Sequence, residues 1–261
     1  MSGKEFLSEK IKTLKKQGAR IIIFDSISHE DLDLIADAVI VSGLNFIAVD
    51  PGSFTATITR KLINPRCNSK ACKILATVGS VNPVSRMQIE ELLNSQEVCS
   101  VFVDTRELVE SQDRRRKEID RVVKEILDNC HSYEVCAVIG YGIMPENRMD
   151  FMLYAQRFQC STDAVSNFIN DSLAEITYEI LKKNPAFQGL YTSGGDITVA
   201  VTKKVQATGI KLHDEVIPLA AYGEFIQGEF NGLKIVTKGG MVGDKKAIQT
   251  CVQYLKEKLF I

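Results

Sequence analysis

The fold is decided by the stretch Gly189-Leu190-Tyr191-Thr192-Ser193-Gly194-Gly195-Asp196-Ile197-Thr198. A short apolar strand runs into two glycines, and an acidic residue and a threonine precede a helix-forming run over residues 199–205. Glycines at a strand-to-helix turn let a ligand approach the backbone closely. The free N–H groups at the start of a helix suit phosphate. The stretch therefore predicts an α/β unit with an anion-binding turn.

Two further glycine loops also follow apolar strands. Gly79-Ser80 comes after residues 73–78, and Lys238-Gly239-Gly240-Met241-Val242-Gly243 comes after residues 233–237. The second loop sets a lysine beside glycine N–H groups, as phosphate loops do. The Walker order is absent, and each loop alone is equally well interpreted as an ordinary turn. Three such loops in one chain predict a nucleotide site.

Helix and strand patterns alternate through most of the chain. Helices between strands imply parallel pairing, and Asn231-Gly232 predicts a late antiparallel hairpin. We therefore expect an α/β fold, layered α/β/α, with a mixed and mostly parallel sheet. The predicted strands cover residues 19–24, 45–49, 73–78, 98–103, 135–139 and 190–191, then 209–212, 216–219, 224–230 and 233–237; the main predicted helices cover 29–41, 84–93, 107–128, 161–183 and 245–259.

A linker is predicted near residues 64–71, which contain Pro65, Asn68 and Ser69. We place the boundary there and expect two parts. The first is a lead-in α/β segment over residues 1–70, and the second covers residues 71–261.

Composition narrows the function classes. The chain has 261 residues, 45% hydrophobic, with 32 basic and 33 acidic residues and a net charge of -1. That balance does not indicate a nucleic-acid partner. No apolar run approaches the roughly 20 residues that span a membrane, and residues 1–16 lack the apolar core of a signal peptide. We expect a cytoplasmic protein with reduced thiols, because the seven cysteines are odd in number.

Other kinds of active site find little support. Cys130-His131 with Cys136 matches no zinc spacing, so no metal site is predicted from the protein's own ligands. No Gly-x-Ser-x-Gly elbow is present, which argues against a serine hydrolase.

Several single residues keep two interpretations. Asp196 falls where a helix N-cap would lie, or it faces ribose hydroxyls or a magnesium shell. Ser80 holds a phosphate or ribose, or belongs to an ordinary turn. Asp25 and Asp50 end predicted strands, where carboxylates line ligand crevices; Asp25 is thus a weak substrate-binding candidate, and capping of the next turn is the alternative for both.

Taken together, the loops resemble those of the four-carbon acid sugar kinases. Residues 78–88, VGSVNPVSRMQ, resemble that family's GS-x-S-P-x-T-x-x-Q stretch. Residues 191–198, YTSGGDIT, resemble TGGDTA, and residues 236–244, VTKGGMVGD, resemble K-S-G-G-F-G-D. Residues 22–25 with Asp31-Leu32 are similar to the passage vvvDA…DL. Order and spacing fit along nearly the whole chain.

The resemblance implies an ATP-dependent kinase acting on threonate, erythronate or 3-oxo-tetronate, with ATP and Mg²⁺ as cofactors. It also implies that residues 71–261 form the nucleotide-binding domain, and that residues 1–70 are the C-terminal remnant of a sugar-acid-binding domain. The implied nucleotide-binding residues are Ser80, Gly194, Gly195, Asp196, Ile197 and Gly240. We add Lys238, Gly239 and Gly243, which belong to the same loop as Gly240. No catalytic base is identified.

This chain departs from the family's pattern in two ways. The DD-x-TGA motif of the acidic substrate site is absent, and Val242 and Gly239 replace a phenylalanine and a serine. We therefore expect the ATP-binding portion of a kinase whose substrate half is a separate polypeptide or a part that this sequence does not include, and a homodimer is compatible with this view. The alternatives are a non-catalytic nucleotide-binding or regulatory module and a small-molecule-binding protein that no longer takes nucleotide.

Overall fold

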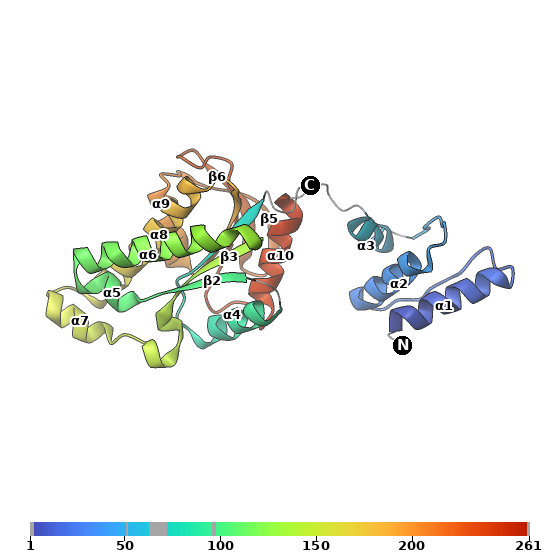
Figure 1. Ribbon diagram of the computed structural model, residues 1–261, viewed down its shortest axis with the longest axis horizontal. Helices are drawn as coiled ribbons and strands as arrows, with labels where there is room; N and C mark the ends of the chain where they lie inside the picture. Colours follow the sequence, from blue (N-terminus) through green and yellow to red (C-terminus); the bar gives the residue numbers. More distant parts are fainter. Residues whose placement is uncertain (1–2, 51, 63–71, 96–97, 260–261) are drawn as a thin grey trace. The chain divides into compact units, whose positions relative to one another are not determined.

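The chain forms two compact units, Met1–Arg66 and Cys67–Ile261. The computed structural model in Figure 1 describes residues 3–50, 52–62, 72–95 and 98–259. The predicted linker at residues 64–71 lies outside the described residues. Each unit is described by itself.

Unit 1 contains the helices α1 (Gly3–Lys16), α2 (His29–Ser42) and α3 (Ser53–Leu62). The N-cap of α2 is Ser28. Ser28 accepts a hydrogen bond from the Asp31 N–H, and the Asp31 carboxylate accepts one from the Ser28 N–H, which completes a capping box. Gly43 ends α2 with a left-handed φ of 67°.

The strands predicted at residues 19–24 and 45–49 are wrong as strands. Both segments are extended, but neither pairs with another strand within the described residues. A strand exists only where its N–H and C=O groups meet a neighbouring ladder, and an apolar sequence cannot supply that neighbour. Side chains that would be buried in a sheet are solvent-exposed: Ile21 is 82% exposed, Ile23 84%, Ile47 91% and Val49 93%.

Unit 2 is built on a seven-stranded sheet in the order β2-β3-β1-β4-β7-β6-β5. All pairings from β2 to β7 are parallel, and the β7–β6 and β6–β5 pairings are antiparallel. This confirms the predicted mixed, mostly parallel sheet. The strands are β1 (Lys73–Val78), β2 (Val98–Val103), β3 (Val135–Gly140), β4 (Phe187–Ser193), β5 (Gly209–Ile217), β6 (Ala220–Ile226) and β7 (Lys234–Lys238).

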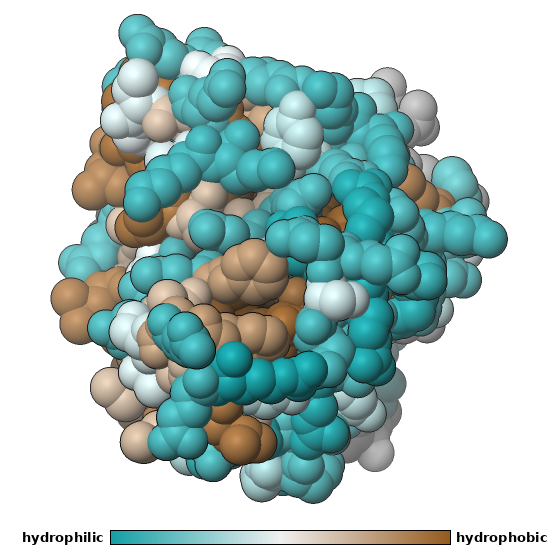
Figure 2. All heavy atoms as spheres, turned by 90° about the vertical axis from the view of Figure 1, so that its left-hand side faces the viewer, coloured by the Kyte–Doolittle hydropathy of each residue, from teal (hydrophilic) through white to brown (hydrophobic). Residues whose placement is uncertain are grey.

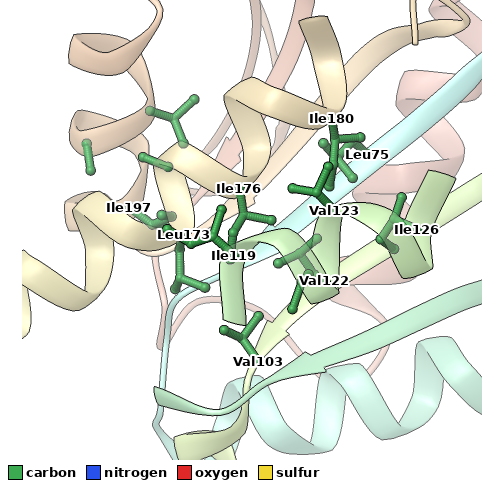
Figure 3. Packing of buried hydrophobic residues seen from close by; sticks show 14 of the residues in the cluster. Leu75, Val103, Ile119, Val122, Val123, Ile126, Leu173, Ile176, Ile180 and Ile197 are labelled. Atoms are coloured by element: carbon green, nitrogen blue, oxygen red, sulfur yellow. The ribbon is translucent and has the colours of Figure 1, made fainter. Parts of the chain in front are cut away.

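Helices cover both faces of this sheet. One core contains Leu75 and Leu190 and packs under α5 (Thr105–Glu110), α6 (Gln112–Asn129), α8 (Thr162–Lys183) and α9 (Gly195–Lys204). The other contains Ile74 and Tyr191 and packs under α4 (Pro83–Ser95) and α10 (Ala247–Leu259). Because successive strand residues point to opposite faces, neighbours in one strand serve different cores. Figure 3 shows side chains of α6, α8 and α9 meeting above β1.

Several predicted elements differ in detail. The segments predicted as two strands, residues 209–212 and 216–219, form the single strand β5, which ends at Ile217. The helix expected over residues 107–128 is divided at Ser111, whose extended backbone (φ -163°) ends α5 and whose hydroxyl caps α6. The hairpin signal at Asn231-Gly232 lies in a longer connection, residues 227–233, between β6 and β7. The Asn231 side chain accepts a hydrogen bond from the Gln227 N–H, which closes that longer loop.

The remaining elements are short. Between β3 and α8 lie the 3₁₀ turns Tyr141–Ile143 and Pro145–Asn147 and the helix α7 (Phe151–Phe158). The face of the molecule in Figure 2 is mostly polar, with separate apolar patches between the polar groups. No helix among the described residues is both long and apolar enough to cross a bilayer.

We predict that Leu173→Ala strongly destabilises unit 2 and that Leu153→Ala does not. Leu173 is 1% exposed in the core of Figure 3, whereas Leu153 on α7 is 61% exposed. The same truncation leaves a cavity only at the first site, at a cost of about 2–5 kcal/mol, against about 0.5 kcal/mol or less at the second. Urea unfolding of the two variants measures the difference. Equal losses would contradict the packing described.

Candidate functional site

The three predicted glycine loops come together at one edge of the sheet. They follow β1, β4 and β7, which are neighbours in the sheet and run parallel, so their carboxyl ends share an edge. The chain leaves β1 toward α4 on one face and leaves β4 toward α9 on the other. This divergence makes a topological switch point, where open α/β sheets bind ligands.

The loop after β1 is a hydrogen-bonded polar turn. Asn82 Nδ2 donates to Ser80 Oγ over 2.5 Å, and the Ser85 N–H donates to Asn82 Oδ1 over 2.8 Å. The Ser85 hydroxyl lies 3.0 Å from Ser80 Oγ and donates to the Gly240 carbonyl over 2.6 Å. The β1 loop is thereby joined directly to the β7 loop.

Glycine is required where these loops touch. A Cβ on Gly240 would lie 2.6 Å from Ser80 Oγ and 3.0 Å from Asn82 Nδ2, which is too close for any side chain. A Cβ on Gly194 would lie 3.8 Å from the Ser80 nitrogen, and Gly194 also has a φ of 115°. The loops that carry Ser80, Gly194 and Gly240 are therefore in mutual contact.

The turn after β4 leaves the start of α9 uncapped. Its N-cap is Gly194, and no side chain caps the helix. The first helical bond runs from the Thr198 N–H to the Gly194 carbonyl, so the N–H groups of Gly195, Asp196 and Ile197 have no acceptor among the described residues. A Cβ on Gly195 would meet nothing within 4 Å. Together these features make an open site with three donors and a favourable helix dipole.

Asp196 and Ile197 have different positions in that turn. The capping interpretation of Asp196 is wrong, because Asp196 lies within the first turn of α9 and Gly194 holds the N-cap position. Its side chain is exposed. Ile197 is 1% exposed and packs against Gly79, so its side chain is not accessible to a ligand.

Lys238 lies beneath the loop that follows it. Its side chain is 2% exposed, and its Nζ donates to the Gly239 carbonyl over 2.7 Å and to the Val242 carbonyl over 3.2 Å. Burial lowers the pKa of this lysine. The sequence predicted a cation at this loop, but it could not show that the cation would be on the inner side.

Gln88 of α4 holds the same loop from a second direction. Its Nε2 lies 2.9 Å from the Val242 carbonyl, 3.2 Å from that of Gly243 and 2.8 Å from that of Asp244. Gly243 has a φ of 82° and lies against Ala247 of α10, where a Cβ would approach to 2.4 Å. The loop is thus anchored to both helices of this face.

Asn170 is a site-edge residue that sequence reasoning missed. It lies on α8, is 8% exposed, and its Oδ1 is 2.9 Å from the position of a Cβ on Gly79. Ser193, at the end of β4, is also buried. No distinct signal in the sequence marks Asn170, because α8 also buries the polar residues Ser172 and Thr177.

Asp25 is in unit 1, in the extended segment after α1, and its side chain is exposed. Nearby, a cavity of about 1290 Å³ is lined by both extended segments and helices α1–α3. Asp50 accepts hydrogen bonds from the N–H groups of Gly52, Phe54 and Thr55, which confirms its capping role. The Thr55 hydroxyl, the largest cause, lowers the pKa of Asp50.

No group of three or more metal-ligating side chains occurs in the part of the chain that the structure describes. The loop site instead offers backbone N–H groups, hydroxyls and one exposed carboxylate. That donor set fits a phosphate chain, with any Mg²⁺ held mainly by phosphate oxygens and water, as that ion prefers.

Comparison with known families agrees with this geometry. The family model described as a nucleotide-binding C-terminal domain matches residues 75–248. The model described as a sugar-binding N-terminal domain matches residues 1–58.

Curated relatives include a D-erythronate kinase from Heliobacterium modesticaldum, 36% identical over 99% of this chain. A D-threonate kinase from Salmonella typhimurium is 23% identical over 96% of the chain. The chain spans 59% and 58% of the length of these relatives, less than two thirds of each.

Solved structures share the fold. A crystal structure from Bordetella bronchiseptica, described as a domain of unknown function with bound citrate and as a domain-swapped dimer, superposes with a TM-score of 0.67 at 20% identity. It is matched over 97% of this chain and 57% of its own. A Haemophilus influenzae protein gives a TM-score of 0.53 at 17% identity, over 97% of this chain and 57% of its own. The chain thus belongs to the four-carbon acid sugar kinase family, and residues 75–248 match that family's nucleotide-binding C-terminal domain.

Proposed function

We propose that this chain is the ATP-binding portion of a kinase that phosphorylates a four-carbon sugar acid of the threonate, erythronate or 3-oxo-tetronate type. The observation that carries the proposal is the meeting of three glycine loops at the switch point between β1 and β4. The names of the curated relatives, D-erythronate kinase and D-threonate kinase, support the substrate class.

In this proposal the nucleotide's phosphates lie between the start of α9 and the loop after β7. The N–H groups of Gly195, Asp196 and Ile197 bind phosphate oxygens on one side, and those of the loop around Gly240 and Gly243 bind on the other. Ser80 binds the phosphates between these two sides, since its Oγ lies where both loops converge. Bound Mg²⁺ would supply charge neutralisation of the phosphates, and the exposed Asp196 carboxylate would bind its water shell.

Phosphoryl transfer then needs positioning more than acid–base chemistry. A hydroxyl of the sugar acid attacks the γ-phosphate, and the N–H groups and Ser80 stabilise the negative charge that develops in the transition state. We assign the substrate half to the part of the sugar-binding domain that this chain does not span, with Asp25 as a substrate-contacting candidate from unit 1. The unpaired extended segments of unit 1 support this assignment. A homodimer is compatible with it, as the Bordetella structure is described as a domain-swapped dimer.

The test of the whole function supplies that missing half. The chain is mixed with the part of the Heliobacterium relative that it does not span, and ADP formation is followed with D-erythronate and D-threonate. Turnover that requires both polypeptides and an acid supports the proposal. ATP binding without turnover in a verified, folded complex would favour the non-catalytic nucleotide-binding module instead.

We predict that the chain binds ATP with Mg²⁺ saturably and that Gly195→Trp abolishes binding without unfolding the protein. Gly195 is helical, and a Cβ there meets nothing within 4 Å, so the new ring occupies the phosphate space without strain. Calorimetric titration gives the affinity, and thermal unfolding reports the fold.

The matched control is Gly209→Trp. Gly209 begins β5 and pairs with Ile226, at the sheet edge opposite the loops, and its Cβ would contact only the Ile226 side chain at 3.9 Å. This variant should bind ATP as the unchanged protein does. Normal binding by Gly195→Trp would exclude the α9 turn as the phosphate site.

We predict that Asp196→Asn weakens ATP binding about tenfold, or ~1.4 kcal/mol, when Mg²⁺ is present and leaves ADP binding without Mg²⁺ unchanged or tighter. A carboxylate beside phosphates is repelled unless a cation lies between them. Because Asp196 caps no helix, the stability loss should stay below about 1 kcal/mol, the helix-dipole contribution. Equal weakening with and without Mg²⁺ would instead favour a ribose contact.

A further inference from the structure

The carbonyl groups of the loop after β7 are turned toward the protein interior. Lys238 binds those of Gly239 and Val242, and Ser85 binds that of Gly240. Gln88 shares the Val242 carbonyl and binds the next two, at residues 243 and 244. Five carbonyls of one short loop are therefore satisfied from within.

The orientation of these carbonyls fixes the orientation of the N–H groups. In a trans peptide the C=O of one residue and the N–H of the next point in opposite directions. The inward carbonyls of residues 239, 240, 242 and 243 thus turn the N–H groups of Gly240, Met241, Gly243 and Asp244 away from the interior. None of these four donates a hydrogen bond to any residue that the structure describes. Successive outward N–H groups make a concave anion site.

Lys238 is an unusual way to hold such a loop. Its ammonium is buried and forms no ion pair within the described residues. The titratable group near it is Cys251 of α10, and burial raises the pKa of the Cys251 thiol to about 12. A buried cation without a counter-ion is costly, yet it raises the positive potential directly beneath the outward N–H groups.

We infer that Lys238 is a positioning residue, which holds the 239–244 loop as an anion nest for the nucleotide phosphates without touching them itself. Gln88 supports the same carbonyls from α4. This inference rests on the proposed function, because the phosphates are those of the bound nucleotide. It separates Lys238 from lysines that reach phosphate oxygens as point charges.

A second buried lysine offers a matched control. Lys73, at the start of β1, is 4% exposed and donates to the carbonyls of Cys130 and Tyr133, both over 2.7 Å. It lies at the opposite edge of the sheet from Lys238, because β1 and β7 run in the same direction. Lys73→Met and Lys238→Met each remove a buried cation that binds two carbonyls, but only the second change frees the phosphate loop.

The first experiment measures backbone ¹⁵N relaxation of the ligand-free protein. We expect order parameters of residues 240–244 near 0.85 in the unchanged protein and in Lys73→Met, and below about 0.6 in Lys238→Met. The second experiment titrates each protein with ATP and Mg²⁺. Lys238→Met should weaken binding at least about tenfold, and Lys73→Met less than about twofold.

The outcomes separate this inference from the proposed function. If the unchanged protein binds no ATP, the proposed function fails, while relaxation still decides whether Lys238 orders the loop. If Lys238→Met loses ATP binding but its free loop stays rigid, Lys238 is a direct phosphate ligand and the inference is overturned. Unchanged binding in Lys238→Met overturns it as well. Should that variant not fold, Gln88→Met carries the same two readouts for the same carbonyls.

Discussion

The candidate site depends on the parallel pairing of β1 with β4. Val78 at the end of β1 lies opposite Ser193 at the end of β4, so the turns that follow must begin side by side. Their helices then diverge to opposite faces of the sheet. Open α/β sheets bind ligands at such a switch point. Without this register, the glycines would be ordinary turn residues.

The close contacts between the loops explain why glycine recurs here. Gly240 is needed because Ser80 lies against it, and Gly194 because of its positive φ and the nearness of Ser80. Gly195 is different, since its backbone is ordinary and space is open beside it. A glycine that neither the backbone nor the packing requires is best explained by a ligand that occupies that space. This contrast is the strongest structural argument for the α9 turn as a binding site.

Sequence reasoning succeeded where information is local. The three loops and the parallel core follow from residue types at short range. It failed where the answer depends on a partner distant in the chain. An inward or outward direction for Lys238 depends on Gln88 and α10, and the polar role of Asn170 depends on Gly79. Neither of these long-range contacts produces a periodic pattern that can be recognised in a single sequence.

The two apolar segments of unit 1 also show that a prediction from sequence fails where the structure depends on a partner distant from the segment. Residues 21–24, Ile-Ile-Ile-Phe, form the continuous apolar run that is typical of a parallel strand covered on both faces. In unit 1 the helices cover only one side, so Ile22 and Phe24 are half-buried while Ile21 and Ile23 are bare. The sequence thus predicts a sheet around these segments, but the described residues contain no strand that pairs with them. Neighbouring strands would bury Ile21, Ile23, Ile47 and Val49 and pair with their backbone. The proposal of a working kinase therefore includes a complementary sugar-binding half that supplies these strands.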